Sequence, residues 1–106
     1  MFESEEAYHL IREIEKNPQA TQRYLAEKMT VSLGKINFLI NALVDKGVIK
    51  IQNFKNSKRK LAYMYLLTPY GIKTKIRLAR EFLTWKTQQY ARLKLEIENF
   101  KKEIKV

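Results

Sequence analysis

The chain has 106 residues and a formal net charge of +10, which is enough sequence for one domain with a modest hydrophobic core. It contains no cysteine, so disulfides and thiolate metal sites are excluded. No apolar run approaches the roughly 18 residues of a membrane span, and the acidic start Met-Phe-Glu-Ser-Glu-Glu lacks the hydrophobic core of a signal peptide. We therefore expect a cytoplasmic protein.

The positive charge is concentrated in the second half of the chain. Residues 1–50 carry seven Lys or Arg and seven Asp or Glu, whereas residues 51–106 carry fourteen and four. A one-sided excess of cations favours a polyanionic partner, with nucleic acid first and an anionic membrane surface second.

Three short helices are predicted in the first half, and each begins after a residue that caps helices well. These caps are Ser4, Thr21 and Ser32. The first helix ends at Asn17-Pro18, the second runs from Gln22 to about Met29, and the third runs to about Lys46. Apolar residues at helical spacing should face inward: Tyr8, Leu10, Ile11, Ile14, Tyr24, Leu25, Met29, Ile36, Leu39, Ile40, Leu43 and Val44.

A hairpin is predicted to follow the third helix. Gly47 suits the left-handed residue that closes a helix. The runs 48–54 and 62–67 are rich in aromatic and aliphatic residues, and a long polar loop separates them. Thr68-Pro69 then opens another helix, with Thr as the cap and Pro in the first turn.

The last predicted element is a helix with no Gly or Pro after Gly71. A seam of residues spaced alternately four and three apart runs along it: Ile72, Ile76, Ala79, Leu83, Lys86, Tyr90, Leu93, Ile97, Phe100 and Ile104. Uninterrupted heptads indicate a coiled coil, about 50 Å long at about 1.5 Å per residue. We expect a second copy to cover the seam, in a homodimer interface made by Ile76, Leu83, Tyr90, Leu93, Ile97, Phe100 and Ile104.

The expected fold is mainly α with a small β-hairpin: a winged helix-turn-helix followed by a long C-terminal coiled-coil-like helix. The pattern divides the chain into a winged helix-turn-helix domain, residues 1–68, and a dimerisation helix, residues 69–106. Such a domain places its third helix at the major groove of DNA and its hairpin, the wing, against flanking phosphates.

The candidate DNA-reading residues lie on the outer side of the third helix: Ser32, Gly34, Lys35, Asn37, Phe38 and Asn41. A lysine can donate to guanine or phosphate, and an asparagine amide matches adenine. The wing cations are Lys55, Lys58, Arg59 and Lys60, which suit phosphates, and Arg59 also suits a minor groove. The alternatives are a merely solvated helix face and a solubilising loop that discourages edge pairing.

Two further groups of residues invite a functional interpretation. Lys73, Lys75, Arg77 and Arg80 open the long helix against its dipole, and either DNA or the acidic first helix would compensate them; we favour the acidic helix. Phe82, Trp85 and Tyr90 would line an effector pocket, although interface packing is the commoner role of aromatic residues at helical spacing. His9 is the single histidine and cannot build a histidine metal site alone.

Three runs carry a resemblance to a known family: Ser32-Leu33-Gly34-Lys35-Ile36-Asn37, Leu43-Val44-Asp45-Lys46-Gly47-Val48-Ile49 and Leu67-Thr68-Pro69-Tyr70-Gly71. Over about residues 7–100 the chain resembles the MarR-type winged helix-turn-helix regulators, most closely the small branch associated with exopolysaccharide gene clusters. The resemblance implies a homodimer on palindromic promoter DNA, with the third helix in the major groove and the wing alongside it.

The expected function is therefore a sequence-specific DNA-binding transcriptional regulator. No nucleophile–histidine pattern, glycine-rich phosphate loop or metal motif is present, so we expect neither an enzyme nor a cofactor. Two rivals stay open: an interaction adaptor that works through the coiled coil, and a basic amphipathic helix lying on anionic lipid. Whether a small-molecule effector exists stays open as well.

Overall fold

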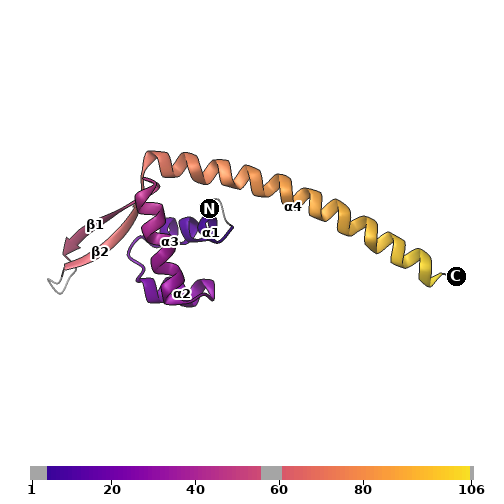
Figure 1. Cartoon of the computed structure of the whole chain (residues 1–106), viewed down its shortest axis with the longest axis horizontal. Coiled ribbons are helices and arrows are strands. Elements are labelled where there is room, and N and C mark those ends of the chain that lie inside the picture. The colour runs from indigo at the N-terminus through magenta and orange to yellow at the C-terminus, as the bar shows by residue number, and fades with distance from the viewer. Residues whose placement is uncertain (1–4, 56–60, 106) are drawn as a thin grey trace.

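The computed structural model describes residues 5–55 and 61–105. In chain order its elements are α1 (Glu5–Lys16), α2 (Gln22–Met29), α3 (Leu33–Asp45), β1 (Ile49–Lys55), β2 (Leu61–Leu67) and α4 (Pro69–Ile104). Residues 5–67 form a head of three helices and a hairpin, and α4 extends far beyond it (Figure 1). The molecule measures 71 × 26 × 22 Å. The predicted fold class is confirmed.

The hydrophobic core lies where the three short helices meet the base of the hairpin and the start of α4. The largest fully buried side chains are Leu10, Ile11, Ile14, Leu25, Ile36, Ile40, Leu43, Val48, Ile49 and Leu78. The inward faces predicted for the first and third helices are thereby confirmed. In α2 the prediction was partly wrong, because Tyr24 is exposed and Ala26 is buried beside Leu25.

The two strands form an antiparallel pair, in which Ile49 lies opposite Leu67 and Lys55 opposite Leu61. Each strand begins or ends within one residue of its prediction. The base of the hairpin joins the head, because the Tyr65 amide donates to the Pro18 carbonyl at 2.8 Å. Beyond Ile49 the first strand leaves the core, and Ile51 is already 45% exposed.

A tight junction ties α4 to the start of β1. Thr68 caps α4 as predicted, since its hydroxyl accepts the Gly71 amide at 2.9 Å. The same hydroxyl donates to the Gly47 carbonyl, and the Thr68 amide donates to the Val48 carbonyl at 3.1 Å. A Cβ on Gly71 would lie 2.0 Å from the Val48 oxygen, so this close approach requires glycine.

The first four turns of α4 pack against the head. Leu78 is fully buried, and the Phe82 ring lies 5.6 Å from the Tyr8 ring of α1. Two ion pairs flank this contact, from Lys75 to Glu15 at 2.6 Å and from Lys86 to Glu5 at 3.4 Å. After Phe82 every described side chain of α4 is exposed. In the described ranges, no helix combines the length and apolarity needed to cross a membrane.

Candidate nucleic-acid interface

One face of α3 is buried and the other is open to solvent. Ile36, Ile40 and Leu43 fill the core, and Leu39 is almost completely covered. The six predicted reading residues are all exposed: Ser32, Gly34, Lys35, Asn37, Phe38 and Asn41. Phe38 is 65% exposed. The helix therefore offers one continuous polar face with an aromatic side chain at its centre.

The turn before α3 fixes where this face begins. Ser32 caps the helix as predicted, and its hydroxyl accepts the Lys35 amide at 3.0 Å. Thr30 has a left-handed backbone with φ of 57°, and the Val31 amide donates to the Ala26 carbonyl at 3.0 Å. This hydrogen bond closes α2 in the manner usually reserved for glycine. A β-branched residue is strained there, and strain of this kind gathers at functional sites.

Lys35 is held by a carboxylate from α1. Its ammonium lies 3.2 Å from the Glu6 side chain, and both side chains are well exposed. An exposed pair of this kind is worth less than about 1 kcal/mol. A phosphate or a guanine edge would therefore displace Glu6 at little cost.

The two asparagines belong to a chain of amide hydrogen bonds that crosses from α3 to α2. The Asn41 amide donates to Asn37 at 3.2 Å, and Asn37 donates to Gln22 at 3.3 Å. Gln22 in turn donates to the Tyr65 hydroxyl at 3.5 Å. Sequence reasoning missed Gln22, because the contact joins residues 15 positions apart. These hydrogen bonds fix the orientation of the Asn37 amide in the protein alone.

The wing cations fall partly outside the described residues. Lys55 is exposed at the end of β1. Lys58, Arg59 and Lys60 lie beyond the described residues, so their interpretation rests on the sequence. The strands that lead to them are ordered as a hairpin beside the head (Figure 1).

The compensation predicted for the basic opening of α4 is found at Lys75, which pairs with Glu15 of the acidic first helix. Arg77 pairs with Glu81 one turn along the same helix, at 3.0 Å.

In the part of the chain that the structure describes, the three aromatic residues of the predicted effector pocket are not brought together. Phe82 packs on Tyr8, whereas Trp85 and Tyr90 are 48% and 67% exposed. These residues point in different directions around α4, so the packing alternative is the correct one for Phe82.

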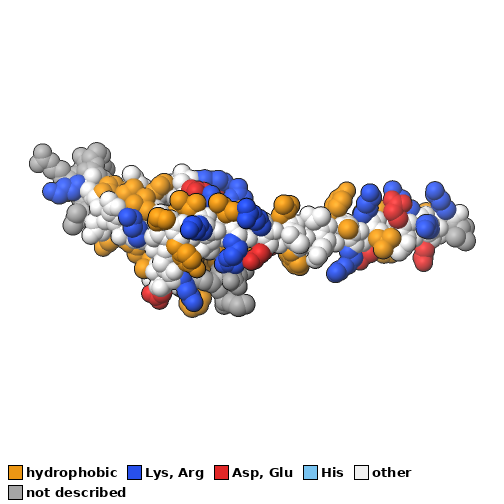
Figure 2. Space-filling view, turned by 90° about the horizontal axis from the view of Figure 1, so that it is seen from above, with side chains coloured by type: hydrophobic (Ala, Val, Ile, Leu, Met, Phe, Trp, Pro, Cys, Tyr) orange, Lys and Arg blue, Asp and Glu red, His pale blue; other side chains and the backbone are white. Residues whose placement is uncertain are grey.

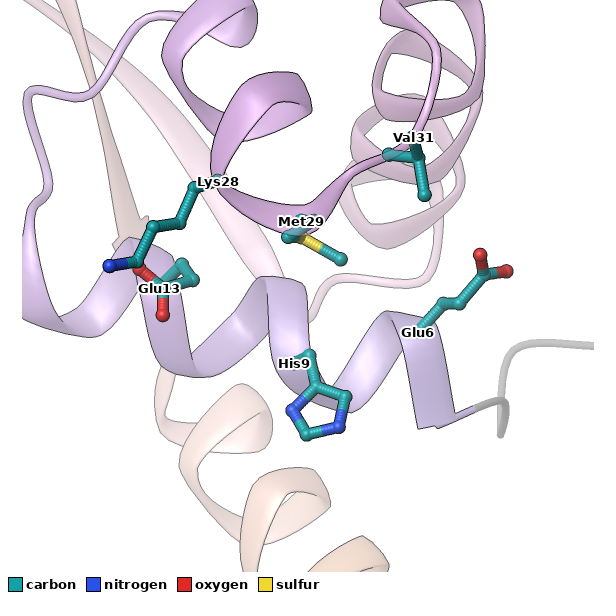
Figure 3. Close-up of a pocket in the computed structure, with 6 residues that line it drawn as sticks. All are labelled: Glu6, His9, Glu13, Lys28, Met29 and Val31. Atoms are coloured by element: carbon teal, nitrogen blue, oxygen red, sulfur yellow. The ribbon is translucent and has the colours of Figure 1, made fainter.

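A small hollow of about 250 Å³ lies instead between α1 and the turn that follows α2. Figure 3 shows its lining residues, Glu6, His9, Glu13, Lys28, Met29 and Val31. His9 is exposed, and its ring lies 3.5 Å from the Glu5 carboxylate. Among the described residues, no group of three or more His, Cys, Asp or Glu is arranged to hold a metal ion.

The predicted seam of α4 is uncovered. Figure 2 shows hydrophobic side chains along the part of α4 that extends beyond the head. The exposed fractions are 45% at Ile76, 68% at Leu83, 46% at Ile97 and 83% at Ile104. Tyr90, Leu93 and Phe100 are exposed as well.

A capped helix that follows a tight interhelical turn, with a hairpin directly after it, defines a winged helix-turn-helix domain. A family model described as winged helix-turn-helix DNA-binding matches residues 8–50, which include α2 and α3. The chain thus contains a winged helix-turn-helix domain. A search of curated proteins found no match.

The solved structures that resemble this chain are MarR-family regulators. With MarR from Staphylococcus aureus, solved with salicylate and kanamycin, the TM-score is 0.61 at 17% identity, over 81% of this chain and 56% of that one. The PcaV regulator from Streptomyces coelicolor, in complex with its natural ligand, gives 0.68 at 16%, over 83% and 61%. FabT from Streptococcus pneumoniae, in complex with DNA, gives 0.56 at 25%, over 83% and 59%.

This likeness establishes a shared fold. The chain spans less than two thirds of the length of each of these three proteins.

Proposed function

We propose that this protein is a sequence-specific, double-stranded DNA-binding transcriptional regulator, a repressor that acts as a homodimer on a palindromic operator. It works without a cofactor and is not an enzyme. The observation that carries the proposal is the exposed face of α3. On it, the side-chain amides of two asparagines, a lysine and a glycine lie beside an exposed phenylalanine. The match of residues 8–50 to a DNA-binding family model supports it.

The reading helix α3 enters the major groove with its N-terminal half. Asn37 and Asn41 present paired donors and acceptors that suit adenine, and Lys35 donates to guanine or to a phosphate. Phe38 contacts a thymine methyl group. Gly34 leaves room for the DNA, since the nearest atom to a Cβ built there is 4.0 Å away.

The wing supplies affinity rather than sequence preference. Lys55, Lys58, Arg59 and Lys60 neutralise phosphates beside the half-site, and Arg59 also fits a narrow minor groove. Phosphate contacts release counterions, so binding weakens with salt, by about one unit of log–log slope for each contact. The sequence supports this role for the wing tip.

The first experiment is selection from a pool of random duplexes at about physiological salt, where weak non-specific binding is suppressed. We expect an enriched palindrome with half-sites about one helical turn apart. Lys35→Ala and Asn37→Ala should then lose about 1–3 kcal/mol of preference at individual base pairs. Arg59→Ala should weaken binding to all duplexes and lower the salt slope, as measured by fluorescence anisotropy.

Lys102→Ala is the matched control, because it removes one exposed lysine from the far end of α4. It should leave the enriched sequence and the preference for it unchanged. If Lys35→Ala, Asn37→Ala and Arg59→Ala all weaken every duplex equally, α3 is not the reading helix. Flat enrichment with salt-sensitive retention would mean non-specific DNA binding.

A second candidate function is an interaction adaptor, which the uncovered apolar seam of α4 favours. The two functions differ in one result. An adaptor would retain no duplex in the selection. The long helix would then be the surface that binds a protein partner.

A further inference from the structure

The head and the seam occupy different faces of α4. Three of the residues that pack against the head are each followed by a seam residue, Gly71 by Ile72, Leu78 by Ala79 and Phe82 by Leu83, whereas the buried Thr74 is followed by Lys75. One residue corresponds to about 100° around an α-helix. The seam therefore runs past the head without being covered by it, and Ile72 and Ile76 are 47% and 45% exposed even where the head is docked.

We propose that two copies pair through the whole seam in antiparallel orientation, with the two-fold axis passing beside residue 88 of each helix. This inference rests on the proposed function in one respect, namely that both heads bind the same duplex. Its occupant is a second copy of this chain, and three independent observations indicate the direction.

The first observation is how the layers of the seam fit. The seam residues alternate between the two apolar positions of the heptad, which are labelled a and d. In an antiparallel pair, every residue at position a lies opposite a residue at position d of the other helix. With the axis beside residue 88, every seam residue finds a seam residue: Leu83 meets the partner's Leu93, and Ala79 meets the partner's Ile97. A small side chain thus faces a large one. Other registers of the same orientation leave one end of the seam unpaired.

The second observation is Lys86, the polar residue of the seam. In the antiparallel register its stem lies against the partner's Tyr90, while its ammonium stays near Glu5 at the rim. A parallel pair would instead place Lys86 against the partner's Lys86, and Ala79 against the partner's Ala79. Such a pair combines two like charges in the partly dehydrated Lys86 layer with a gap at the Ala79 layer, and both destabilise it.

The charges beside the seam are mixed and do not reverse this preference. A parallel pair gains an attraction between Glu96 and the partner's Lys101. The antiparallel pair sets Arg80 against the partner's Lys94 and Lys73 against the partner's Lys101, but it also sets Glu103 against the partner's Lys75. Exposed ion pairs of this kind contribute little to stability. The seam layers therefore decide the direction.

The third observation is where the heads lie. An antiparallel pair has its two-fold axis perpendicular to the plane of both helices. Because the head lies about 100° from the seam, this axis places both heads on the same side of the pair. A parallel pair has its axis along the helices and places the heads on opposite sides. The two Leu78 residues would be about 30 Å apart along the helices, close to one turn of B-DNA, about 34 Å.

The cysteine-free sequence permits a direct test in the full-length protein. We would prepare Leu83→Cys and Leu93→Cys separately, attach a size tag to one of them, refold them alone and mixed, and oxidise. The antiparallel register predicts a disulfide between the two different variants and little within either one. Leu95→Cys lies on the opposite face of α4 and is the matched control, which should not crosslink.

A second readout leaves the seam intact. A nitroxide label on Lys102→Cys should give an electron–electron distance of about 40 Å in the antiparallel dimer and less than about 20 Å in a parallel one. Disulfides within each variant together with the short distance would overturn the antiparallel direction. A monomer in light scattering would overturn the pairing altogether.

Anisotropy with the enriched duplex on the same samples separates this inference from the proposed function. Duplex binding by a monomer or a parallel dimer would retain the function and remove the antiparallel pairing. Antiparallel crosslinks in a protein that binds no duplex would retain the pairing and remove the function.

Discussion

Gly71 is the residue on which the arrangement of wing and long helix depends. Its Cα faces the Val48 carbonyl so closely that a Cβ would stand 2.0 Å from the oxygen, and the Leu67 side chain crowds the same space at 3.3 Å. The obstacle is backbone, which cannot rotate away as a side chain can. Glycine is needed here because a side chain has no space. The backbone conformation is not the reason, since the φ of Gly71 is not in the left-handed region.

Gly71→Ala is therefore expected to destabilise the fold by about 1–3 kcal/mol, the usual range for overpacking. Thermal unfolding followed by circular dichroism should show a melting temperature lower by several degrees. Gly34→Ala is the control, because the space around Gly34 is open. This variant should keep the stability of the parent or increase it by up to about 1 kcal/mol. Equal melting temperatures for Gly71→Ala and the parent would mean that the junction yields without strain.

At the scale of the element, α4 carries two patterns at once. The heptad seam is the stronger, since it repeats over the whole helix, and it was readable from the sequence. The head-facing positions Gly71, Leu78 and Phe82 each lie one residue before a seam residue, and with Thr74 they form a stripe that lasts for only a few turns. Periodicity does not say which of two neighbouring stripes is covered within one chain.

Leu78→Ala tests the docking of α4 on the head. Leu78 is fully buried, so we expect a loss of about 2–5 kcal/mol in the free energy of unfolding, from lost apolar contact and the cavity left behind. Leu95→Ala removes the same atoms from a side chain that is 63% exposed, and should change stability by less than about 0.5 kcal/mol. Urea unfolding measures both, and similar losses would show that α4 does not depend on this contact.

The sequence also predicted the caps well and the side-chain network poorly. Thr21, Ser32 and Thr68 act as caps where they were expected, because capping is a local relation of a few residues. The Lys35–Glu6 pair and the Asn37–Gln22 hydrogen bond join separate helices, so they depend on how these helices pack. Periodicity and propensity carry no such information.

At the scale of the whole molecule, the seam of α4 exposes large apolar side chains from Ile76 to Ile104, and an extended apolar surface of this kind favours a partner. In the proposed dimer, Leu93→Asp combined with Ile97→Asp places two charges in the seam, and light scattering should then report a monomer. Leu95→Asp adds a charge to the opposite face and should leave the dimer intact. A dimer that survives the double substitution would place the interface elsewhere.

The junction at Thr68 and Gly71 has a mechanical consequence. Because hydrogen bonds and close contact tie the start of α4 to the start of β1, the long helix and the base of the hairpin turn as one piece. The 36-residue helix α4 has no glycine beyond its first turn, so it lacks a site at which it would kink, and a rotation at one end moves the other end with it. In the proposed dimer, a molecule that separates the two long helices would thus change the distance between the wings and leave each head unchanged. Binding of such a molecule would therefore change which spacing of half-sites along the DNA the two heads can contact together.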